Sequence, residues 1–292
     1  MNIFITGGSG FIGRNLVEHL TKNHQVFAPS HKELELLDEK AVRDYFKGHK
    51  FDIVIHSAVR PGHRNTKDSS NQLYNNMRMF FNIIRNKEAF GKMIFLSSGA
   101  VYDVSKMLSK VKESDFDAHV PIDEHGFSKY IIAKHIERLD DVVELRIFGI
   151  FGKYEDYAIR FISNAICKAI FDLPITIKQN RKFDYLFIDD LMLVIDYFIK
   201  NKGSHKAYNA TPDKAVELLS LAEKVKKVSG KNLPIVMGNR TMGFEYSGDN
   251  SRLKNEIECI KFTNIGLSIK KLYEWYFNNK KMLNKEFLLI DK

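Results

Sequence analysis

The chain has 292 residues, of which 44% are hydrophobic and 28% charged, which suits a globular protein of one large or two interlocked domains. The N-terminal residues lack a charged leader, and no stretch approaches the roughly 18 apolar residues of a membrane span. We therefore expect a cytoplasmic protein without a membrane segment. The net charge of +9 is scattered, with no run of five basic residues, which argues against nucleic acid as a partner. The two cysteines stand in no metal-ligand spacing, so no metal is expected.

Short apolar runs alternate with stretches of helical periodicity through the first half of the chain. The expected strands are residues 2–6, 24–28, 51–58, 92–98 and 141–148, and the expected helices are residues 11–22, 38–48, 71–90 and 123–139. Strands that alternate with helices of this length predict a parallel sheet covered on both faces. The fold class is therefore α/β, with a Rossmann-type doubly wound parallel sheet.

The alternation becomes less regular after about residue 150. Further helices are expected at residues 156–171, 215–230 and 268–279, with strands at residues 173–177 and 207–211. Residues 185–201 are expected to be the end of a strand that runs into a helix. We expect a dinucleotide-binding domain and a smaller, mostly α substrate-binding domain. The first would comprise residues 1–155 and 183–210, and the second residues 156–182 and 211–292.

A glycine-rich stretch, TGGSGFIG, follows the first strand and opens the first helix. Gly7, Gly10 and Gly13 stand where a tight turn, a close approach to a diphosphate and a helix–strand contact need glycine. The free N–H groups at the helix start attract phosphate. We therefore expect a dinucleotide here, and Phe11, Ile12 and Arg14 complete the predicted contact.

The residues after the second strand indicate which dinucleotide binds. An acidic residue at the end of this strand would hold the ribose 2′-hydroxyl of NAD. The strand instead ends in APSHKE, with Ser30, His31 and Lys32 at the expected place. A hydroxyl and two basic groups suit a 2′-phosphate, which predicts NADP (NADPH) and makes NAD the less favoured cofactor.

Nine short motifs, in order along most of the chain, resemble those of the extended short-chain dehydrogenase/reductase family. They are TGGSGFIG, ELLD, FDIVIHSA, YNNMRMFFNII, FLSSGAVYD, HGFSK, LRIFGIFG, YLFIDDL and YNAT. This family contains sugar-nucleotide epimerases, dehydratases and ketoreductases. Its members bind a nicotinamide dinucleotide, and the resemblance extends the predicted cofactor contacts to Glu35, Leu36, Ala58, Val59 and Phe148.

The resemblance also implies the catalytic residues. Ser98 matches the hydroxyl that binds the reacting carbonyl. Family members have Y-G-x-S-K where this chain has HGFSK, so His125 stands at the position of the catalytic tyrosine and Lys129 is its partner. Lys129 would also hold the nicotinamide ribose, and its positive charge would lower the pKa of His125.

A second pair, Tyr130 and Lys134, has the same i,i+4 spacing. It points about 140° away around the helix, so both pairs cannot face one pocket. The Gly-x-Ser-Lys context favours His125 and Lys129.

The residues after Ser98 narrow the reaction. Gly99 and Ala100 stand where related dehydratases carry an acidic pair, and Ala100 also replaces the cysteine of GDP-fucose synthases, which resemble this chain in APSHKELELLD. Ketoreduction needs neither group. We expect NADPH-dependent reduction of the C4 keto group of a nucleotide-linked 4-keto-6-deoxy sugar, a hexose or heptose, for surface polysaccharide synthesis. The alternatives are a C4-epimerase with bound NAD and a non-catalytic dinucleotide-binding protein.

Four basic residues of the second half are candidates for contact with the substrate diphosphate. They are Arg160, Lys178, Arg181 and Arg252. Family members pair through the helices that match residues 71–90 and 125–139, so a homodimer is expected.

Overall fold

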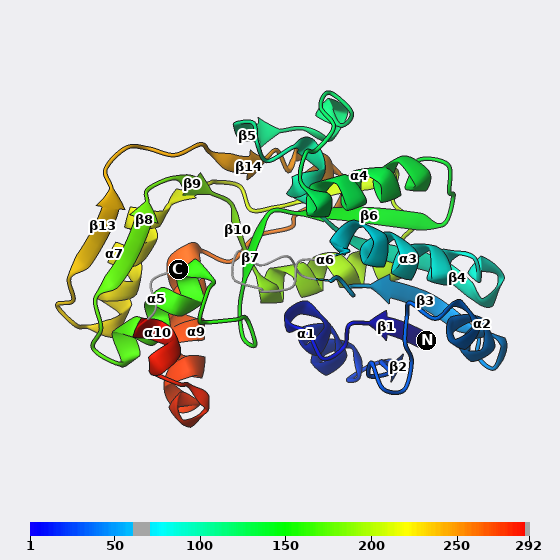
Figure 1. Cartoon of the computed structure of the whole chain (residues 1–292), viewed down its shortest axis with the longest axis horizontal. Helices are drawn as coiled ribbons and strands as arrows, with labels where there is room; N and C mark the ends of the chain where they lie inside the picture. Colours follow the sequence, from blue (N-terminus) through cyan, green and yellow to red (C-terminus); the bar gives the residue numbers. More distant parts are fainter. Residues whose placement is uncertain (61–70, 290–292) are drawn as a thin grey trace.

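The centre of the molecule is a six-stranded parallel sheet, seen in a computed structural model that describes residues 1–60 and 71–289 (Figure 1). In spatial order the strands are β11 (Ala207–Ala210), β6 (Val142–Ile147), β4 (Phe90–Ser98), β3 (Phe51–His56), β1 (Asn2–Thr6) and β2 (Gln25–Phe27). From β1 the chain goes to β2 on one side and then to β3 on the other. This reversal places a crevice beyond the carboxyl ends of β1 and β3, where ligands of such sheets bind.

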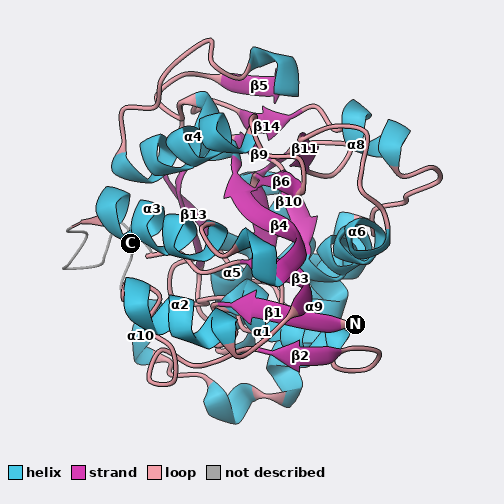
Figure 2. Ribbon diagram, turned by 90° about the vertical axis from the view of Figure 1, so that its right-hand side faces the viewer, coloured by secondary structure: helices cyan, strands magenta, loops and turns pink. Residues whose placement is uncertain are grey.

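Alternate residues of the strands build two hydrophobic layers. Ile3 and Ile5 belong to the layer on one face, and Phe4 to the layer on the other. The helices α1 (Phe11–Leu20) and α6 (Ile188–Lys200) cover the first face, and α2 (Glu39–Lys47), α3 (Gln72–Ile84) and α4 (Glu124–Ile136) cover the second. Figure 2 shows α3 and α4 on the side of the sheet opposite α6.

A second region packs beyond the carboxyl edge of the sheet (Figure 1). Its main helices are α5 (Phe161–Ile170), α7 (Leu218–Ser229) and α9 (Ile265–Asn278), with the short α8 (Ser251–Glu256) and α10 (Glu286–Leu289) beside them. Short strands connect this region to the first: β5 (Leu108–Val111), β7 (Gly149–Phe151), β8 (Ile175–Gln179), β9 (Lys182–Phe183), β10 (Tyr185–Phe187), β12 (Val216–Glu217), β13 (Ile235–Asn239) and β14 (Tyr246–Gly248). Most of these strands were not expected, because runs of two to five residues carry too little periodicity.

The expected helix over residues 71–90 is wrong at its C-terminal end. The helix α3 stops at Ile84, a 3₁₀ turn follows at Lys87–Ala89, and Phe90 already pairs with Phe51 in the sheet. Gly91 does not close a helix but lies in β4, where a β-carbon would come within 2.9 Å of the Asp52 carbonyl oxygen. The other 3₁₀ turns are Gly99–Tyr102, Glu113–Asp115 and Lys280–Met282.

Within residues 1–60 and 71–289, no helix combines the length and the apolar character that crossing a bilayer requires. The same residues contain no cluster of three or more His, Cys, Asp or Glu side chains suited to a metal ion.

Candidate active site

The glycine turn between β1 and α1 is closely packed. The Gly10 N–H donates to the Gly7 carbonyl at 2.9 Å, and Gly7 has a φ of +69°. A β-carbon on Gly13 would lie 2.0 Å from the Gly7 carbonyl oxygen, so no other residue fits there. No side chain caps α1, and its first turn carries no acidic residue. The N–H groups of this turn are therefore suited to hold a diphosphate.

The end of β3 lies against this turn. The Ser57 and Ala58 N–H groups donate to the Thr6 hydroxyl at 3.1 and 3.0 Å. A β-carbon on Gly7 would come within 2.9 Å of the Ala58 α-carbon. Val59, the next residue, is 40% exposed. The structure thus brings the predicted diphosphate and ribose contacts together at the carboxyl ends of β1 and β3.

The loop after β2 brings two carboxylates to the predicted 2′-phosphate contacts. The Ser30 N–H donates to the Glu33 carboxylate at 2.7 Å, and His31 pairs with Glu35 at 2.8 Å. Lys32 is exposed. No acidic residue stands at the end of β2, but the loop folds back and brings the Glu33 carboxylate to the Ser30 backbone, which the sequence did not predict. Leu36 packs against the second-face hydrophobic layer.

Arg14, the remaining predicted cofactor contact on α1, lies 3.8 Å over the ring of Tyr154. Its guanidinium is exposed at the rim of the glycine turn.

At the end of β4, Ser98 begins a 3₁₀ turn and its hydroxyl oxygen accepts the Ala100 N–H at 3.1 Å. The start of α4 is close to this turn. Asp123 caps the helix by accepting the Gly126 N–H at 2.8 Å, and a β-carbon on Gly126 would lie 2.7 Å from the Ala100 carbonyl oxygen. Glycine at 126 therefore lets the first turn of α4, with His125, approach Ser98.

Lys129, one turn further along α4, is 5% exposed. Its ammonium donates to the Leu96 carbonyl at 3.0 Å and lies 4.5 Å over the Phe95 ring. Burial lowers the pKa of Lys129 to about 8, and the carboxylate of Glu144 opposes that change. Burial is the main cause that lowers the pKa of His56 to about 3, and the charge of the Lys129 ammonium lowers it further.

His125 is neutral near pH 7. Burial is the largest cause of its pKa of about 4, and the charge of Lys129 is the second. The direction expected from Lys129 is therefore confirmed, although burial contributes more. The guanidinium of Arg160 acts in the same direction, and Asp123 opposes it.

The competing pair lies on the outer surface of α4. The Tyr130 hydroxyl donates to Asp117, and Lys134 pairs with the same carboxylate at 3.2 Å. Lys134 is 40% exposed. The structure therefore does not bring Tyr130 and Lys134 to the site of Ser98.

Tyr246, on β14, was missed from the sequence. Its hydroxyl would be 2.7 Å from a β-carbon on Gly99, the residue after Ser98. Phe148, predicted to contact the cofactor, packs its ring 5.0 Å from that of Tyr246. No motif surrounds Tyr246, and only the pairing of β14 with β5 and β9 shows where it lies.

Two of the predicted substrate contacts influence the pKa of one tyrosine. The guanidinium groups of Arg160 and Arg181 both act on Tyr185, opposing the burial that raises its pKa. Arg160 also acts on His125. Lys178 is exposed on β8. The charges of two of the four basic candidates thus reach Tyr185, and that of Arg160 also reaches His125.

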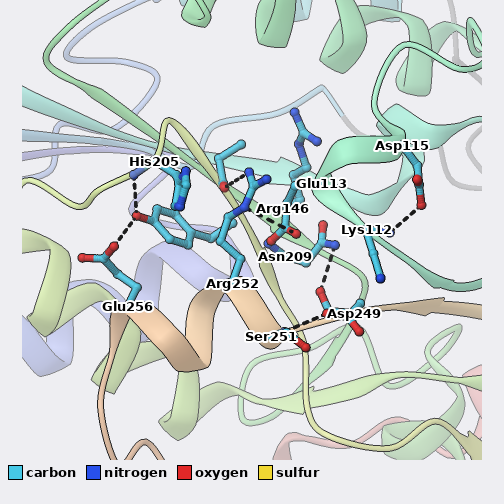
Figure 3. Close-up of polar contacts among 12 residues, drawn as sticks. Lys112, Glu113, Asp115, Arg146, His205, Asn209, Asp249, Ser251, Arg252 and Glu256 are labelled. Atoms are coloured by element: carbon cyan, nitrogen blue, oxygen red, sulfur yellow. Dashed lines mark hydrogen bonds and ion pairs between the residues drawn. The ribbon is translucent and has the colours of Figure 1, made fainter.

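Arg252 lies elsewhere, in a cluster at the β6–β11 edge of the sheet (Figure 3). Its guanidinium donates to the Ala207 carbonyl at 3.2 Å and is 3.8 Å from Glu113. These residues line a cavity of about 230 Å³ that has no contribution from Ser98, His125 or Lys129. The structure therefore does not bring Arg252 together with the other substrate candidates.

Buried hydrogen bonds of the same cluster reach the 3₁₀ turn that follows Ser98. Arg146 donates twice to the buried Glu144, at 2.9 and 3.0 Å, and once to the Tyr102 hydroxyl at 2.9 Å. Tyr102 in turn donates to Asn209 on β11 at 2.8 Å. This buried network holds the 3₁₀ turn after Ser98 against β6 and β11.

Comparison with known proteins agrees with this geometry. A model of the NAD dependent epimerase/dehydratase family matches residues 3–211. A GDP-L-colitose synthase of Yersinia pseudotuberculosis is 24% identical, with 96% of this chain and 99% of the relative covered.

Two solved structures have the same fold. A GDP-mannoheptose C4 reductase from Campylobacter jejuni with NADP bound superposes with a TM-score of 0.80 at 23% identity, covering 94% of this chain and 98% of that one. A GDP-L-fucose synthetase from Naegleria fowleri bound to NADP gives a TM-score of 0.85 at 14% identity, covering 96% and 93%.

The family match spans more than half of the chain and includes the glycine turn, the Ser98 turn and α4. The chain therefore belongs to the NAD dependent epimerase/dehydratase family, of the extended short-chain dehydrogenase/reductase type, and is an oxidoreductase that uses a nicotinamide dinucleotide.

Proposed function

We propose that this enzyme reduces the C4 keto group of a nucleotide-linked 4-keto-6-deoxy sugar, a hexose or heptose, with NADPH, in the synthesis of a surface polysaccharide. The observation that carries the proposal is the Ser98 turn. A hydroxyl suited to a carbonyl oxygen stands on a turn that packs against the start of α4, the helix of His125 and Lys129, and the next two residues, Gly99 and Ala100, carry no group that moves a proton. Reduction needs only a hydrogen-bond donor and one proton at the carbonyl oxygen. Epimerisation at carbon and elimination of water need further acids or bases.

The cofactor supplies hydride when bound, and the chain's own residues orient it. The uncapped start of α1 holds the diphosphate, and Lys129 holds the nicotinamide ribose. His31 and Lys32 face the 2′-phosphate. The relatives that share this fold support NADP, since both the heptose C4 reductase and the fucose synthetase were solved with it.

The substrate diphosphate would be held by Arg160 and Arg181. The charges of both lower the pKa of Tyr185, and the charge of Arg160 also lowers that of His125. A sugar whose diphosphate rests on these guanidinium groups is thereby directed towards His125 and Ser98. Planar guanidinium groups bind phosphate oxygens through paired hydrogen bonds.

The test mixes the purified protein with NADPH and, in separate reactions, GDP-, dTDP-, UDP- and CDP-linked 4-keto-6-deoxy sugars. We expect loss of NADPH absorbance with one nucleotide series and formation of the corresponding 4-hydroxy sugar. The matched control is Lys200→Ala, at an exposed lysine at the end of α6. Arg181→Ala should raise KM at least tenfold, whereas Lys200→Ala should leave it within about twofold. If no member of the panel oxidises NADPH, the proposed function is wrong.

A second candidate, C4 epimerisation with bound NAD, has one observation in its favour. The Glu33 carboxylate lies at the Ser30 backbone, where an acidic group would suit the unmodified ribose of NAD. Protein that retains NAD through purification, and that interconverts a 4-hydroxy sugar without added cofactor, would support this candidate over reduction.

A further inference from the structure

A buried histidine lies at the crevice between the glycine turn and the end of β3. His56 is the last residue of β3, pairs in register with Thr6 of β1, and is 2% exposed. Its imidazole stacks on the Phe95 ring of β4, with the centroids 5.7 Å apart, and its centroid lies 6.3 Å from that of the Phe80 ring on α3. Neither the proposed reduction nor the predicted cofactor contacts use this side chain, although Ala58 is only two residues away.

The hydrogen bonds of Thr6 determine which nitrogen of His56 carries the proton. The Thr6 hydroxyl oxygen accepts the Ser57 and Ala58 N–H groups at 3.1 and 3.0 Å. The same oxygen lies 2.8 Å from Nδ1 of His56. A hydroxyl has two lone pairs and one proton, and the two amides already take both lone pairs. The Thr6 proton is therefore donated to Nδ1, and His56 carries its own proton on Nε2.

This direction requires a neutral imidazole, because a protonated ring has hydrogen on both nitrogens and cannot accept. Burial, and after it the charge of Lys129, lowers the pKa of His56 to about 3. The Lys129 ammonium lies 4.5 Å over the Phe95 ring on which His56 stacks. The imidazole is therefore neutral at neutral pH and remains an acceptor.

The same contacts join β1 to β3 at the carboxyl edge of the sheet. The Ser57 hydroxyl donates to the Thr6 carbonyl at 2.8 Å, so the two chain segments are joined in both directions. Gly7 follows Thr6 directly, and a β-carbon on Gly7 would come within 2.9 Å of the Ala58 α-carbon. The hydrogen bonds of the Thr6 hydroxyl thus fix how closely the end of β3 approaches the glycine turn.

We propose that His56 is a positioning residue for the nicotinamide dinucleotide, which accepts the Thr6 proton at Nδ1 and so keeps both lone pairs of that hydroxyl on the two amides that follow β3. The wall of the crevice at Ala58, where the diphosphate and ribose are predicted, then has one geometry before the cofactor arrives. A site arranged in advance binds more tightly because less order is lost on binding. The inference concerns cofactor binding and does not depend on which sugar is reduced.

A histidine that only filled space among aromatic rings would make different demands on a replacement. Leucine is apolar and fills much of the space beside Phe80 and Phe95, but it accepts no hydrogen bond. Asparagine places a carbonyl oxygen close to the position of Nδ1, but it fills less space and buries an amide N–H₂ group among apolar rings. A comparison of His56→Leu with His56→Asn therefore separates packing from positioning.

The first experiment measures the dissociation constants of NADPH and NADH by fluorescence titration, and the stability of each variant by urea denaturation. For the cofactor that wild type binds more tightly, we expect His56→Leu to weaken binding at least tenfold. His56→Asn should stay within about threefold of wild type although it is the less stable variant. Wild-type affinity in His56→Leu, or an order of affinity that follows the order of stability, would overturn the proposal.

His49→Leu is the matched control for this comparison. His49 is a part-buried histidine whose ring stacks on those of Tyr45 and Phe51, and its Nδ1 lies 2.8 Å from the Tyr45 carbonyl oxygen. It precedes β3 and therefore lies at the amino end of that strand, away from the crevice. Loss of these contacts should lower stability and leave cofactor affinity within about twofold of wild type. An equal loss of affinity in both leucine variants would contradict the role assigned to His56.

The tautomer can be measured in the wild-type protein, so this part of the test does not require that any variant folds. In protein labelled with ¹⁵N in histidine, two-bond ¹H–¹⁵N correlation spectra distinguish a ring protonated at Nε2 from one protonated at Nδ1. The His56 ring, assigned through its backbone resonances, should be protonated at Nε2 alone at neutral pH. A proton on Nδ1 would reverse the hydrogen bond with Thr6, and the proposal would then be wrong.

Hydrogen exchange of the two amides reports the contact itself. In His56→Leu the Ser57 and Ala58 amides should exchange at least tenfold faster relative to the amides within β3, and in His56→Asn they should remain protected. Unchanged protection in His56→Leu would show that these amides do not depend on His56. If the affinities, the tautomer and the exchange rates all follow expectation but no keto sugar oxidises NADPH, the role of His56 is supported and the proposed reduction is wrong.

Discussion

The protonation of His125 is controlled by its immediate neighbours. Its side chain is part-buried and faces the ammonium of Lys129 and the guanidinium of Arg160, so the imidazolium is disfavoured by both desolvation and like charge. With a pKa of about 4, about one imidazole in a thousand carries a proton at pH 7. A proton delivered by this residue is therefore scarce in the neutral range, and increasingly available in acid.

This gives a prediction at the scale of one residue. If His125 supplies the product proton, kcat for reduction should rise about tenfold for each unit that the pH falls from 7.5 to 5, since the imidazolium fraction rises by that factor above its pKa. In His125→Asn the slope should vanish and kcat at pH 5 should drop at least a hundredfold. Initial rates of NADPH oxidation, corrected for its acid decay, measure both. A rate that is flat with pH and unchanged in His125→Asn would remove this residue from the mechanism.

At the scale of elements, the junction of β1 with α1 depends on glycine for its geometry. We expect Gly13→Ala to weaken NADPH binding at least a hundredfold, because its methyl group would collide with the Gly7 carbonyl and open the turn. Gly48→Ala, at the end of α2, is the control. Its β-carbon would be 3.7 Å from the nearest atom, and its φ of −85° suits any residue. Cofactor fluorescence on titration gives both dissociation constants, and equal values for the two variants would contradict the prediction.

The buried Asp184 connects three further elements. Its carboxylate accepts the Thr211 hydroxyl after β11 at 2.6 Å and the Gly248 N–H of β14 at 2.8 Å. Burial is the main cause of its pKa of about 6, against an ordinary value of 3.8. The folded state therefore holds a proton that the unfolded state has lost, and the stability from this group falls as the pH rises from about 4 through 6.

Asp184→Asn should remove that dependence. Relative to wild type, the free energy of unfolding of the variant should rise by about 2 kcal/mol between pH 4.5 and pH 8. Urea denaturation at both pH values measures it, and Asp189→Asn, at an exposed carboxylate of α6, controls for surface charge. A variant whose stability follows that of wild type at both pH values would show that Asp184 does not titrate in this range.

The elements also show why parts of the site were predictable. The glycine motif at the start of the first helix indicated the cofactor turn, and the resemblance to the family's motifs indicated Ser98 and the His125 and Lys129 pair. Tyr246 lies on a strand of three residues with no periodicity, and only tertiary pairing brings it to Ser98. The contact of Glu33 with Ser30 depends on how a loop folds back. The position at which α3 ends depends on the pairing of Phe90 with the sheet. The local sequence pattern predicts none of these three features.

At the scale of the molecule, the site is assembled from two regions. The six-stranded sheet supplies the glycine turn, Ser98 and α4, and the second region supplies Tyr246, Arg160 and Arg181. The strand pairs β10–β7 and β14–β5 join the two without a long linker. Substrate bound between the regions would contact both, so its binding should depend on their relative position.

The outward face of α3 and α4 is the surface on which a homodimer is predicted. Tyr74 of α3 is 61% exposed, and Phe81 and Ile131 line a surface hollow of about 310 Å³ with Lys134 and His135. Apolar side chains exposed side by side on two packed helices are typical of subunit interfaces.

We therefore expect light scattering to give a mass near twice the 33.8 kDa of one chain. Ile131→Glu should reduce it to one chain, because a paired interface would bury the two introduced carboxylates. Leu193→Glu, at a leucine 53% exposed on α6 across the sheet, should leave the mass unchanged. A wild-type protein that runs as a single chain, or an equal effect of both substitutions, would show that this face does not pair two subunits.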